Sequence, residues 1–519
     1  MNSGTDRYGI AIWDRLAFAE QHWDVTGETD LPAILSGRPC SPISLGGLAD
    51  ANFFGGHIER AREGYTLLLE RHPDKPALMQ RLLHCHDVVC DWAARSHLAV
   101  ALDDTINRVG VIEGYEPLCY LTVPMDISRS RLFAERRAAP VQKWVGDKKL
   151  TRQNTTKQLR IGYISIDFRS HSCGTPLWPV LKVHNRDRFY VIAYSLAAGD
   201  FRDTIIPRVA GCTDAVRDLA GDTWNQALRR IRADNLDILV DTTRNIRGAP
   251  LSLLARQLAP IEVSAWGFGG APGNSMIDVV LGDETCFPMH EDGYYSEQIR
   301  RLPAYHPPSE CEYVDLPALH GRTAVGLPVD SVVLACFVTH YKINEDIFGC
   351  WMRILQRVPS AILWLMAGTE TGRRNLQHAA AKLGVDPMRL FFAQPVARQH
   401  HLARMRLVDL VLDNPRLGGS ASIPDALSTA TPGITWHGVV PEERGGASYL
   451  RASGFPDLVA CDVNAYEDLA VQLASDCGAR SNVRSRMQLR IEETCDELRS
   501  WVRGFEAILE DIAEPEHKS

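Results

Sequence analysis

The sequence VDLVLDNPRLGGSASIPDAL, residues 408–427, decides the fold that we expect of this chain. It opens with five nearly continuous apolar residues, which is typical of a strand buried on both faces of a sheet. Asn, Pro and two Gly residues follow, and they predict a loop. Ser420 or Ser422 then suits the N-cap of a helix that has Pro424 in its first turn. The stretch is therefore expected to fold as strand, loop and helix.

A loop between a buried strand and a helix can bind phosphate. The first N–H groups of a helix lack partners within it, and the helix dipole adds positive charge at the same end. A phosphate or diphosphate is therefore one expected ligand of this stretch. The alternative is an ordinary strand-to-helix connection of a parallel sheet, and this stretch alone leaves both interpretations open.

Length and composition place the chain among globular proteins of the cytoplasm. Its 519 residues are enough for two or three domains with large cores. A net charge of −8 and a pI near 6.1 argue against a nucleic-acid partner. No apolar run approaches the roughly 18–20 residues that span a bilayer, so no membrane partner is expected. Residues 1–14 lack a signal-peptide pattern and the 13 cysteines show no disulfide framework, which predicts a cytoplasmic location.

Residues 1–157 are expected to form a helical N-terminal region. Apolar residues at helical spacing on either side of Pro73 predict two helices, and these resemble one degenerate tetratricopeptide-like unit. No period of about 34 residues accompanies them, so an array of such units is not expected. Residues 141–158 are polar and basic and predict a linker.

His84, Cys85, His86 and Cys90 raise the alternative of a metal site in this region. His86 and Cys90 share one helical face, a spacing that suits a metal ion. A structural zinc site needs four ligands, however, and the sequence offers no second pair such as CxxC. A packed helix without a metal ion is the favoured interpretation.

Two blocks of alternating strands and helices follow, and they predict an α/β fold class. Such alternation is typical of doubly wound parallel sheets, whose ligands bind at the carboxyl ends of the strands. The first block predicts a Rossmann-like domain over 158–325, and the second predicts another over 326–519 that includes the C-terminal helices. The expected strands are 159–165, 188–195, 236–241, 261–265 and 277–281, then 332–337, 361–366, 390–392, 408–412, 433–436 and 458–460.

Four collinear segments carry a family resemblance. These segments are 159–171 (LRIGYISIDFRSH), 259–283, 341–365 and 394–425. The resemblance as a whole spans about residues 85–505, and its first recognisable sequence is Cys-Asp-Trp at 90–92. These segments resemble the catalytic region of the protein O-GlcNAc transferase / SPINDLY family. The resemblance implies a glycosyltransferase of class EC 2.4.1 with the GT-B arrangement, in which two Rossmann-like domains face each other across a cleft. The long tetratricopeptide superhelix of that family is nearly absent from this sequence.

The resemblance also implies the partners of the reaction. The donor is then a nucleotide sugar, with UDP-GlcNAc expected first, and the acceptor is a Ser or Thr of a protein or peptide. No metal ion and no other cofactor is expected. Members of the SPINDLY type use GDP-fucose on the same scaffold, so that donor stays open as an alternative.

The residues that match the site of the family are distributed over both domains. His171 matches a histidine that acts as base or orients the acceptor, and Lys342 matches the lysine that neutralises the donor diphosphate. Asp425 matches the carboxylate that holds the ribose, while His401 is expected to stack on the base with Arg404 near the base edge. The remaining matches are Ala397, Arg398, Ser420 and Ser422 for the nucleotide sugar, Gly269, Gly270 and Gly273 for the loop that lines sugar and acceptor, and Arg444 in a later helix.

The chemistry of these residue types agrees with the resemblance. Glycosyl transfer releases a diphosphate, and a lysine together with helix N–H groups can stabilise its developing charge. No Asp-x-Asp follows a strand in the manner of a metal clamp. The alternatives for the single residues are an exposed turn lysine at Lys342, a hydrogen-bonded loop histidine at His171 and a helix-surface histidine at His401.

Two departures from the family pattern concern the sugar and the acceptor. Residues 418–422 read Gly-Gly-Ser-Ala-Ser where the family has Asn-Gly-(His/Gly/Ala)-Thr-Thr, so one hydroxyl is lost at Ala421. The acceptor loop has Gly269 in place of the family proline, followed by Ala271 and Pro272 in place of Thr-Ser/Thr. Three functions therefore stay open: a protein glycosyltransferase, a GT-B transferase or epimerase that acts on small molecules, and a nucleotide-binding protein without catalysis.

Overall fold

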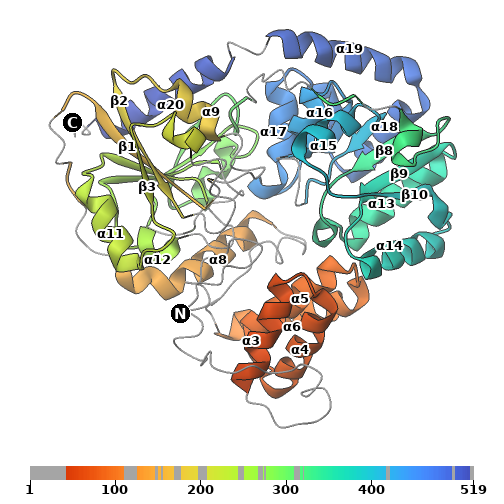
Figure 1. The fold of residues 1–519 in the computed structure, drawn as a ribbon, viewed down its shortest axis with the longest axis horizontal. Helices are drawn as coiled ribbons and strands as arrows, with labels where there is room; N and C mark the ends of the chain where they lie inside the picture. The colour runs from red at the N-terminus through yellow and green to blue at the C-terminus, as the bar shows by residue number, and fades with distance from the viewer. Residues whose placement is uncertain are drawn as a thin grey trace.

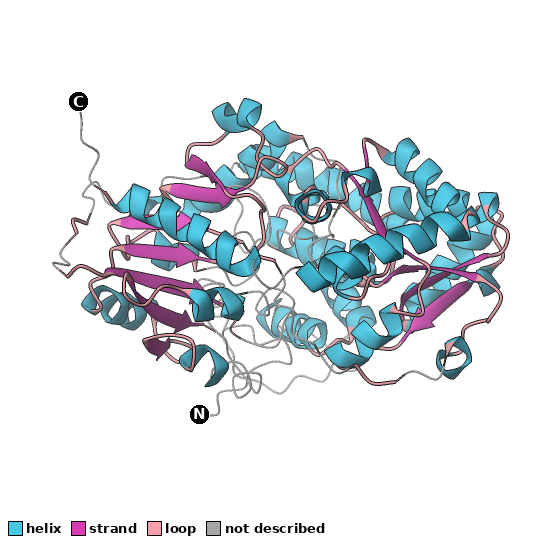
Figure 2. Cartoon of the chain, turned by 90° about the horizontal axis from the view of Figure 1, so that it is seen from above, coloured by secondary structure: helices cyan, strands magenta, loops and turns pink. Residues whose placement is uncertain are grey.

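The computed structural model describes residues 42–109, 126–145, 150–152, 156–166, 168, 177–196, 207–243, 250–266, 273, 276–308, 316–318, 321–416, 421–493 and 497–514. Two α/β domains lie side by side, and a bundle of helices lies against the second domain (Figure 1). Seen from above, the strands of the two domains form two separate sheets with helices around them (Figure 2). Among the described helices, none is long and apolar enough to cross a membrane.

The N-terminal helices pack around one apolar cluster, as the helical spacing predicts. Ala61, Tyr65, Leu68 and Leu82 are all buried in this cluster. The helical N-terminal region is therefore confirmed for the described residues. Its elements are α3 (Pro42–Phe54), α4 (Ile58–Arg71), α5 (Pro76–Val88), α6 (Trp92–Val109), α8 (Ile127–Ala138) and the 3-10 helix η1 (Ala139–Trp144).

The histidines and cysteines of this region serve packing and pairing. Cys85 and Cys90 are buried, and Nδ1 of His86 lies 3.2 Å from Oδ2 of Asp91. Within the described ranges, no three His, Cys, Asp or Glu side chains gather where they could hold a metal ion. Helix α5 ends at Val88 and Cys90 has a φ of +53°, so the prediction that His86 and Cys90 share one helical face is wrong. Cys90 is buried in the turn that follows the helix.

The first domain is organised by a seven-stranded sheet in the order β3-β2-β1-β4-β5-β6-β7. Every pairing is parallel, and β1 lies between β2 and β4 with Ile161 opposite both Val191 and Ile238. The strands are β1 (Leu159–Ser165), β2 (Phe189–Ser195), β3 (Ala215–Asp218), β4 (Ile238–Asp241), β5 (Ile261–Ser264), β6 (Val279–Gly282) and β7 (Gln298–Arg301). The described helices are α9 (Leu177–Val183), α11 (Trp224–Ala233), α12 (Leu251–Leu254) and the 3-10 helix η2 (Met289–Tyr294).

The apolar patterns in the sequence do not predict β3 and β7, the two edge strands of this sheet. Their sequences are Ala-Val-Arg-Asp and Gln-Ile-Arg-Arg, and no residue of either strand is fully buried. An edge strand has one side open to solvent, so charged residues replace the apolar run by which a central strand is recognised.

The second domain repeats the plan with six parallel strands in the order β10-β9-β8-β11-β12-β13. In both sheets the chain starts inside the sheet, moves to one edge and returns to build the other, which confirms the predicted doubly wound fold. The strands are β8 (Val332–Cys336), β9 (Ala361–Met366), β10 (Leu390–Ala393), β11 (Leu410–Leu412), β12 (Gly433–Trp436) and β13 (Val459–Ala460). The α-helices are α13 (Glu345–Arg357), α14 (Glu370–Lys382), α15 (Arg398–Met405), α16 (Ser422–Ser428), α17 (Gly445–Ala452) and α18 (Val463–Ser475). The 3-10 helices of this part are η3 (Arg322–Val325), η4 (His340–Lys342), η5 (Pro387–Arg389), η6 (Pro441–Glu443) and η7 (Pro456–Leu458).

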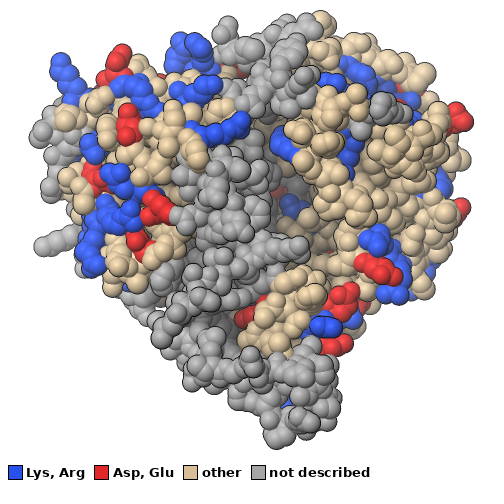
Figure 3. Space-filling view, in the orientation of Figure 1, with Lys and Arg blue, Asp and Glu red and all other residues tan. Residues whose placement is uncertain are grey.

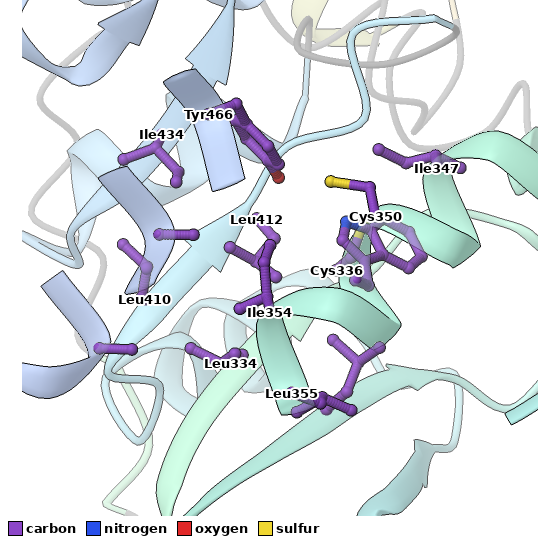
Figure 4. Close-up of a cluster of buried hydrophobic side chains, with 14 of the residues drawn as sticks. Leu334, Cys336, Ile347, Cys350, Ile354, Leu355, Leu410, Leu412, Ile434 and Tyr466 are labelled. Atoms are coloured by element: carbon purple, nitrogen blue, oxygen red, sulfur yellow. The ribbon is translucent and has the colours of Figure 1, made fainter. Parts of the chain in front are cut away.

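Helix α13 shows how the sequence builds the core of the second domain. The side chain of Asn344 accepts a hydrogen bond from the N–H of Ile347, and Glu345 and Asp346 place negative charge in the first turn. The apolar face of the helix packs onto the sheet, where each fully buried side chain of this size contributes about 1.5–3 kcal/mol. The cluster in Figure 4 includes Leu334, Cys336, Ile347, Cys350, Ile354, Leu355, Leu410, Leu412, Ile434 and Tyr466.

A buried ion pair joins the two domains. Arg444 of the second domain donates to both carboxylate oxygens of Glu291 in the first domain, at 2.8 and 2.7 Å. It also donates to the carbonyl oxygen of Cys286 at 3.0 Å. Burial lowers the pKa of Arg444, but the hydrogen bonds and charge of Glu291 outweigh burial and leave that pKa raised. Nearby, Oγ of Ser448 donates to Oδ2 of Asp283 at 2.7 Å across the same boundary.

The last helix returns to the first domain. After α19 (Cys477–Glu493), α20 (Glu497–Ala513) lies beside α9 (Figure 1). Trp501 and Phe505 of α20 are buried in one cluster with Ile161 and Tyr163 of β1. The structure thus differs from the expected division, which gives 326–519 to the second domain, because the apolar face of α20 completes the core of the first.

Replacing Arg444 with Met is expected to lower the free energy of unfolding by about 3–5 kcal/mol, because the Glu291 carboxylate stays buried without its partner. Urea denaturation followed by circular dichroism measures this loss. Arg486→Met is the matched control, since Arg486 makes two similar contacts with Asp457, at 2.8 and 3.0 Å, in a partly exposed position. Such surface pairs contribute about 0–1 kcal/mol. Equal losses in the two variants would contradict a buried tie between the domains.

Candidate functional site

The candidate site lies at the carboxyl ends of β8 and β11, where the strand order of the second sheet reverses. Ligands of doubly wound sheets bind in the crevice at such a reversal. Lys342 follows β8 in the turn η4, and Asn414 follows β11. Nδ2 of Asn414 donates to the carbonyl oxygen of Lys342 at 2.5 Å, so the two loops are joined at the reversal point.

The charge of Lys342 is available to a ligand. Its side chain is partly exposed, and none of the described carboxylates forms an ion pair with it. Nζ of Lys342 lies 6.0 Å from the centre of the Tyr341 ring. A cation in this position attracts an anionic group. The role of Lys342 stays a prediction, as does its alternative, an exposed turn lysine.

The helix that follows β11 begins at Ser422, two residues before Pro424, as α16. Its N-cap position is Ala421, which makes no side-chain capping bond, so the predicted N-cap role of Ser422 is wrong. Oγ of Ser422 donates instead to Oδ1 of Asp413 at 2.8 Å. The predicted alternative, Ser420, lies outside the described residues. A strand, a loop and a helix are nevertheless observed in the expected order.

Asp413 organises this loop, a role that the sequence analysis does not identify. Besides Ser422, its carboxylate accepts a hydrogen bond from Oγ1 of Thr435 at 2.7 Å, and its carbonyl oxygen accepts one from the hydroxyl of Tyr466 at 2.9 Å. Asp413 and Thr435 are fully buried. The signal in the sequence is an acidic residue directly after a buried strand, where a carboxylate has to find partners among neighbouring loops.

Asp425 is a buried, ionised carboxylate with two partners from helix α15. Arg398 donates to both of its oxygens, at 2.7 and 3.3 Å, and Nε2 of His401 lies 3.2 Å from Oδ2. Burial raises the pKa of Asp425, but the hydrogen bond from His401 and the charge of Arg398 outweigh burial and hold the pKa below its usual value. The structure therefore brings three of the predicted residues together.

Arg404 orients His401 through the ring nitrogen that does not face Asp425. Its Nε donates to Nδ1 of His401 at 3.1 Å, and since a guanidinium only donates, Nε2 of His401 carries the proton that faces Asp425. Arg404 is buried, and burial lowers its pKa to about 10, so it stays charged at neutral pH. It also donates to the carbonyl oxygen of Gln394 at 2.7 Å. Arg404 is thus held by the protein on several sides.

Aromatic rings complete this edge of the sheet. The guanidinium of Arg404 lies 4.7 Å from the centre of the Phe337 ring and 6.0 Å from that of Trp364. The ring of His401 meets Phe337 edge to face at 5.4 Å. Ala397 is exposed just before α15, and its carbonyl oxygen accepts the N–H of His401. The ring of His401 is therefore fixed at the margin of the site.

The predicted residues of the first domain are only partly described. His171, Gly269 and Gly270 lie outside the described residues. Gly273 has a φ of +74°, and a Cβ atom there would lie 2.3 Å from Cβ of Ala134 in α8. Its N–H donates to Oε1 of Glu297 at 2.8 Å. The backbone geometry and the close approach of α8 are sufficient reasons for a glycine at this position.

A hollow opens beside the second domain in the space-filling view, and atoms of Lys or Arg lie inside it (Figure 3). The described edge of the second sheet offers an unpaired ammonium group at Lys342 and an ionised carboxylate at Asp425. An ammonium group binds an anion, and a carboxylate accepts hydrogen bonds from hydroxyl groups. Lys342 therefore suits an anionic group, and Asp425 suits a hydroxyl group.

Comparison with known proteins identifies relatives of this chain. A model of glycosyl transferase family 41 matches residues 140–307 and 309–503. The probable UDP-N-acetylglucosamine–peptide N-acetylglucosaminyltransferase SEC of Arabidopsis thaliana is 29% identical over 413 residues, which cover 76% of this chain and 42% of that protein. The similarly named SPINDLY protein of Petunia hybrida is 28% identical over 64% of this chain and 36% of its own length. The chain thus spans about two fifths of the length of these relatives.

A solved structure shows the same fold. A mutant of the O-GlcNAc transferase of Thermobaculum terrenum superimposes with a TM-score of 0.80 at 22% sequence identity. The alignment covers 93% of this chain and 92% of that one. The GT-B arrangement of two Rossmann-like domains is therefore confirmed.

Proposed function

Because the chain belongs to glycosyl transferase family 41, we propose that it transfers GlcNAc from UDP-GlcNAc to Ser or Thr of a protein or peptide. The observation that carries this proposal is the pair of opposite charges at one sheet edge, Lys342 after β8 and Asp425 in the first turn of α16. A nucleoside diphosphate sugar has an anionic diphosphate for the first and ribose hydroxyls for the second. The names of the relatives in plants support GlcNAc as the sugar and a peptide as the acceptor.

In the proposed reaction the acceptor hydroxyl attacks the anomeric carbon of the sugar. The new C–O bond forms while the bond from that carbon to the diphosphate breaks, and the hydroxyl proton passes to a base, for which His171 is proposed. UDP leaves with the bonding electrons. Lys342 opposes the charge that accumulates on the departing diphosphate, so its contribution is largest in the transition state.

Asp425 is proposed to hold the ribose, and α15 to lie beside the base. The half-exposed Arg398, whose side chain is 51% accessible, can turn away from Asp425 and free a carboxylate oxygen for a ribose hydroxyl. His401 keeps its proton directed at the same carboxylate because Arg404 fixes its other nitrogen. One partner of Asp425 is thus exchangeable and the other is held in place.

One observation favours a second candidate donor or acceptor. Ala421 occupies the N-cap position of α16 and contributes no hydroxyl where the family pattern has threonine. A changed sugar contact is consistent with GDP-fucose as donor, with a small-molecule acceptor, or with nucleotide binding without transfer. Incubation of the protein with cell lysate and either labelled UDP-GlcNAc or labelled GDP-fucose separates these functions. Label from UDP-GlcNAc in protein is expected, whereas label confined to small molecules, or none, would contradict the proposal.

The transfer is proposed to need no divalent metal ion. No cluster of three candidate ligands occurs in the described part of the chain, and a fixed lysine can supply the positive charge that a metal ion supplies elsewhere. We expect labelling to persist in excess EDTA at the rate seen without chelator. A loss that Mg²⁺ or Mn²⁺ restores would show that the reaction depends on a metal.

Lys342→Ala is expected to lower turnover by about 10²–10³-fold, because one preorganised charge at a leaving oxyanion has that weight. The affinity for UDP should fall much less, since the ground-state diphosphate carries charge that solvent can also screen. Initial rates at saturating donor and calorimetric titration with UDP measure the two effects. Lys382→Ala, an exposed lysine in the last turn of α14, is the control and should match the wild type. Wild-type turnover in Lys342→Ala would rule out the proposed role.

Asp425→Asn is expected to fold and to bind its nucleotide at least about tenfold more weakly, which is roughly 1.4 kcal/mol. The asparagine keeps the shape of the side chain but removes the charge, and hydrogen bonds to charged groups contribute roughly 1.5–3 kcal/mol. Calorimetric titration with UDP and with GDP tests this. Asp457→Asn is the control, since Asp457 also pairs with an arginine but lies on the surface. If Asp425→Asn binds both nucleotides as the wild type does, Asp425 serves only the helix end.

A further inference from the structure

The helical N-terminal region contacts the second domain at the turn that carries Lys342. Helix α5 lies against η4, and the ring of His84 in α5 is 5.0 Å from the ring of Tyr341. The contact continues on α14, where Nδ2 of Asn375 donates to the carbonyl oxygen of Val89 at 2.8 Å. Two segments far apart in the sequence thus meet directly at the candidate site.

Trp92, the first residue of α6, makes a directed bond to this turn. Its Nε1 donates to the carbonyl oxygen of Ile343 at 2.9 Å, one residue after Lys342. The indole is buried, and its ring packs at 5.3 Å on that of Phe348 in α13. Trp92 belongs to the apolar core of the second domain although it lies in the N-terminal helical region.

Cys90 makes a second contact with the turn. Its Sγ lies 3.8 Å from the carbonyl oxygen of His340, and the residue is buried in the same core as Trp92. Cys90 has a φ of +53°, a conformation that non-glycine residues adopt at a cost of about 1–3 kcal/mol. The link between α5 and α6 is therefore held in a strained form at the point where it meets η4.

The other sides of the turn are also fixed. Nε2 of His340 lies 2.9 Å from the carbonyl oxygen of Met366, and a Cβ atom added at Gly368 or Gly372 would lie 2.2 or 2.5 Å from Nδ1 of the same ring. Asn414 binds the carbonyl oxygen of Lys342 itself. The turn therefore has anchors in the sheet on one side and in the N-terminal helices on the other.

From these contacts we infer that Trp92 is a positioning residue for Lys342, so that the N-terminal helical region forms part of the donor site. The inference rests on the proposed function of Lys342. A lysine side chain is flexible, and its ammonium group is placed only as well as its backbone is held. The bond from Trp92 fixes the peptide between Ile343 and Asn344, one residue beyond the peptide that Asn414 holds. A shift of 1 Å at a catalytic group can cost about 10²-fold in rate.

The decisive variant is Trp92→Phe, which keeps an aromatic ring against Phe348 and removes the N–H donor. We expect turnover at saturating donor to fall by about ten- to a hundredfold while the KM for the donor changes little. In the Lys342→Ala background the same substitution should cause no further loss, because two residues that act through one group are not additive. Amide exchange at residues 340–343 should become faster, since the turn loses an anchor.

Trp501→Phe is the matched control. Nε1 of Trp501 also donates to a buried carbonyl oxygen at 2.9 Å, that of Ala304, but in the first domain. We expect Trp501→Phe and Trp92→Phe to lower the unfolding temperature by a similar amount. Trp501→Phe should nevertheless keep wild-type turnover and unchanged amide exchange at residues 340–343.

Each outcome has a separate meaning. Unchanged amide exchange at residues 340–343 in Trp92→Phe overturns the inference. If Lys342→Ala is impaired, the inference is also overturned when Trp92→Phe turns over like the wild type, or when the two substitutions cause additive losses in the double variant. If Lys342→Ala itself turns over normally, the proposed function of the lysine fails first and the positioning role falls with it.

Discussion

The hydrogen bond from Asn414 to the carbonyl oxygen of Lys342 joins the two loops on which the candidate site depends. One loop follows β8 and the other follows β11, and these neighbouring strands are the place where the sheet order reverses. Because all strands are parallel, every loop at their carboxyl ends opens on the same edge. This edge therefore brings together the lysine after β8, the start of the helix after β11 and the helix after β10, although they are far apart in the sequence. The continuous apolar strands beneath them keep this edge rigid, since their side chains are almost completely buried.

The second domain is joined to the rest of the chain at three places. Arg444 is paired with Glu291 of the first domain in a buried position, so separating the domains would leave both charges without their partners. Helix α20 crosses back and completes the core around β1, which ties the end of the chain to its first strand. The N-terminal helices contribute Trp92 to the core of the second domain. Three separate sets of contacts therefore fix the two domains and the N-terminal helices relative to one another.

Most central elements follow from the sequence, because buried parallel strands need apolar runs and helices need caps. β1, β9 and β12 have the predicted bounds, and α11 begins after a Thr223–Gln226 capping box. The edge strands β3 and β7 do not follow, because half-exposed strands tolerate arginine. The partners of buried polar groups were also beyond prediction: nothing in the local sequence says that Ser422 bonds to Asp413 and leaves the N-cap to Ala421. Such bonds depend on which loops meet, and that is set by the fold.

Arg398 and Arg404 lie in the same helix near Asp425 but differ in burial and in their hydrogen-bond partners. Arg404 is buried and bonded to His401 and to the carbonyl oxygen of Gln394, whereas the side chain of Arg398 is 51% exposed and its guanidinium pairs with Asp425. The guanidinium of Arg398 is already half in water, so it can exchange Asp425 for solvent more readily than a buried group can. Moving Arg404 would leave a buried charge without its hydrogen-bond partners. Asp425 therefore has one partner, His401, that is held by a buried arginine and another, Arg398, that is half exposed. The two partners together keep the buried carboxylate of Asp425 ionised.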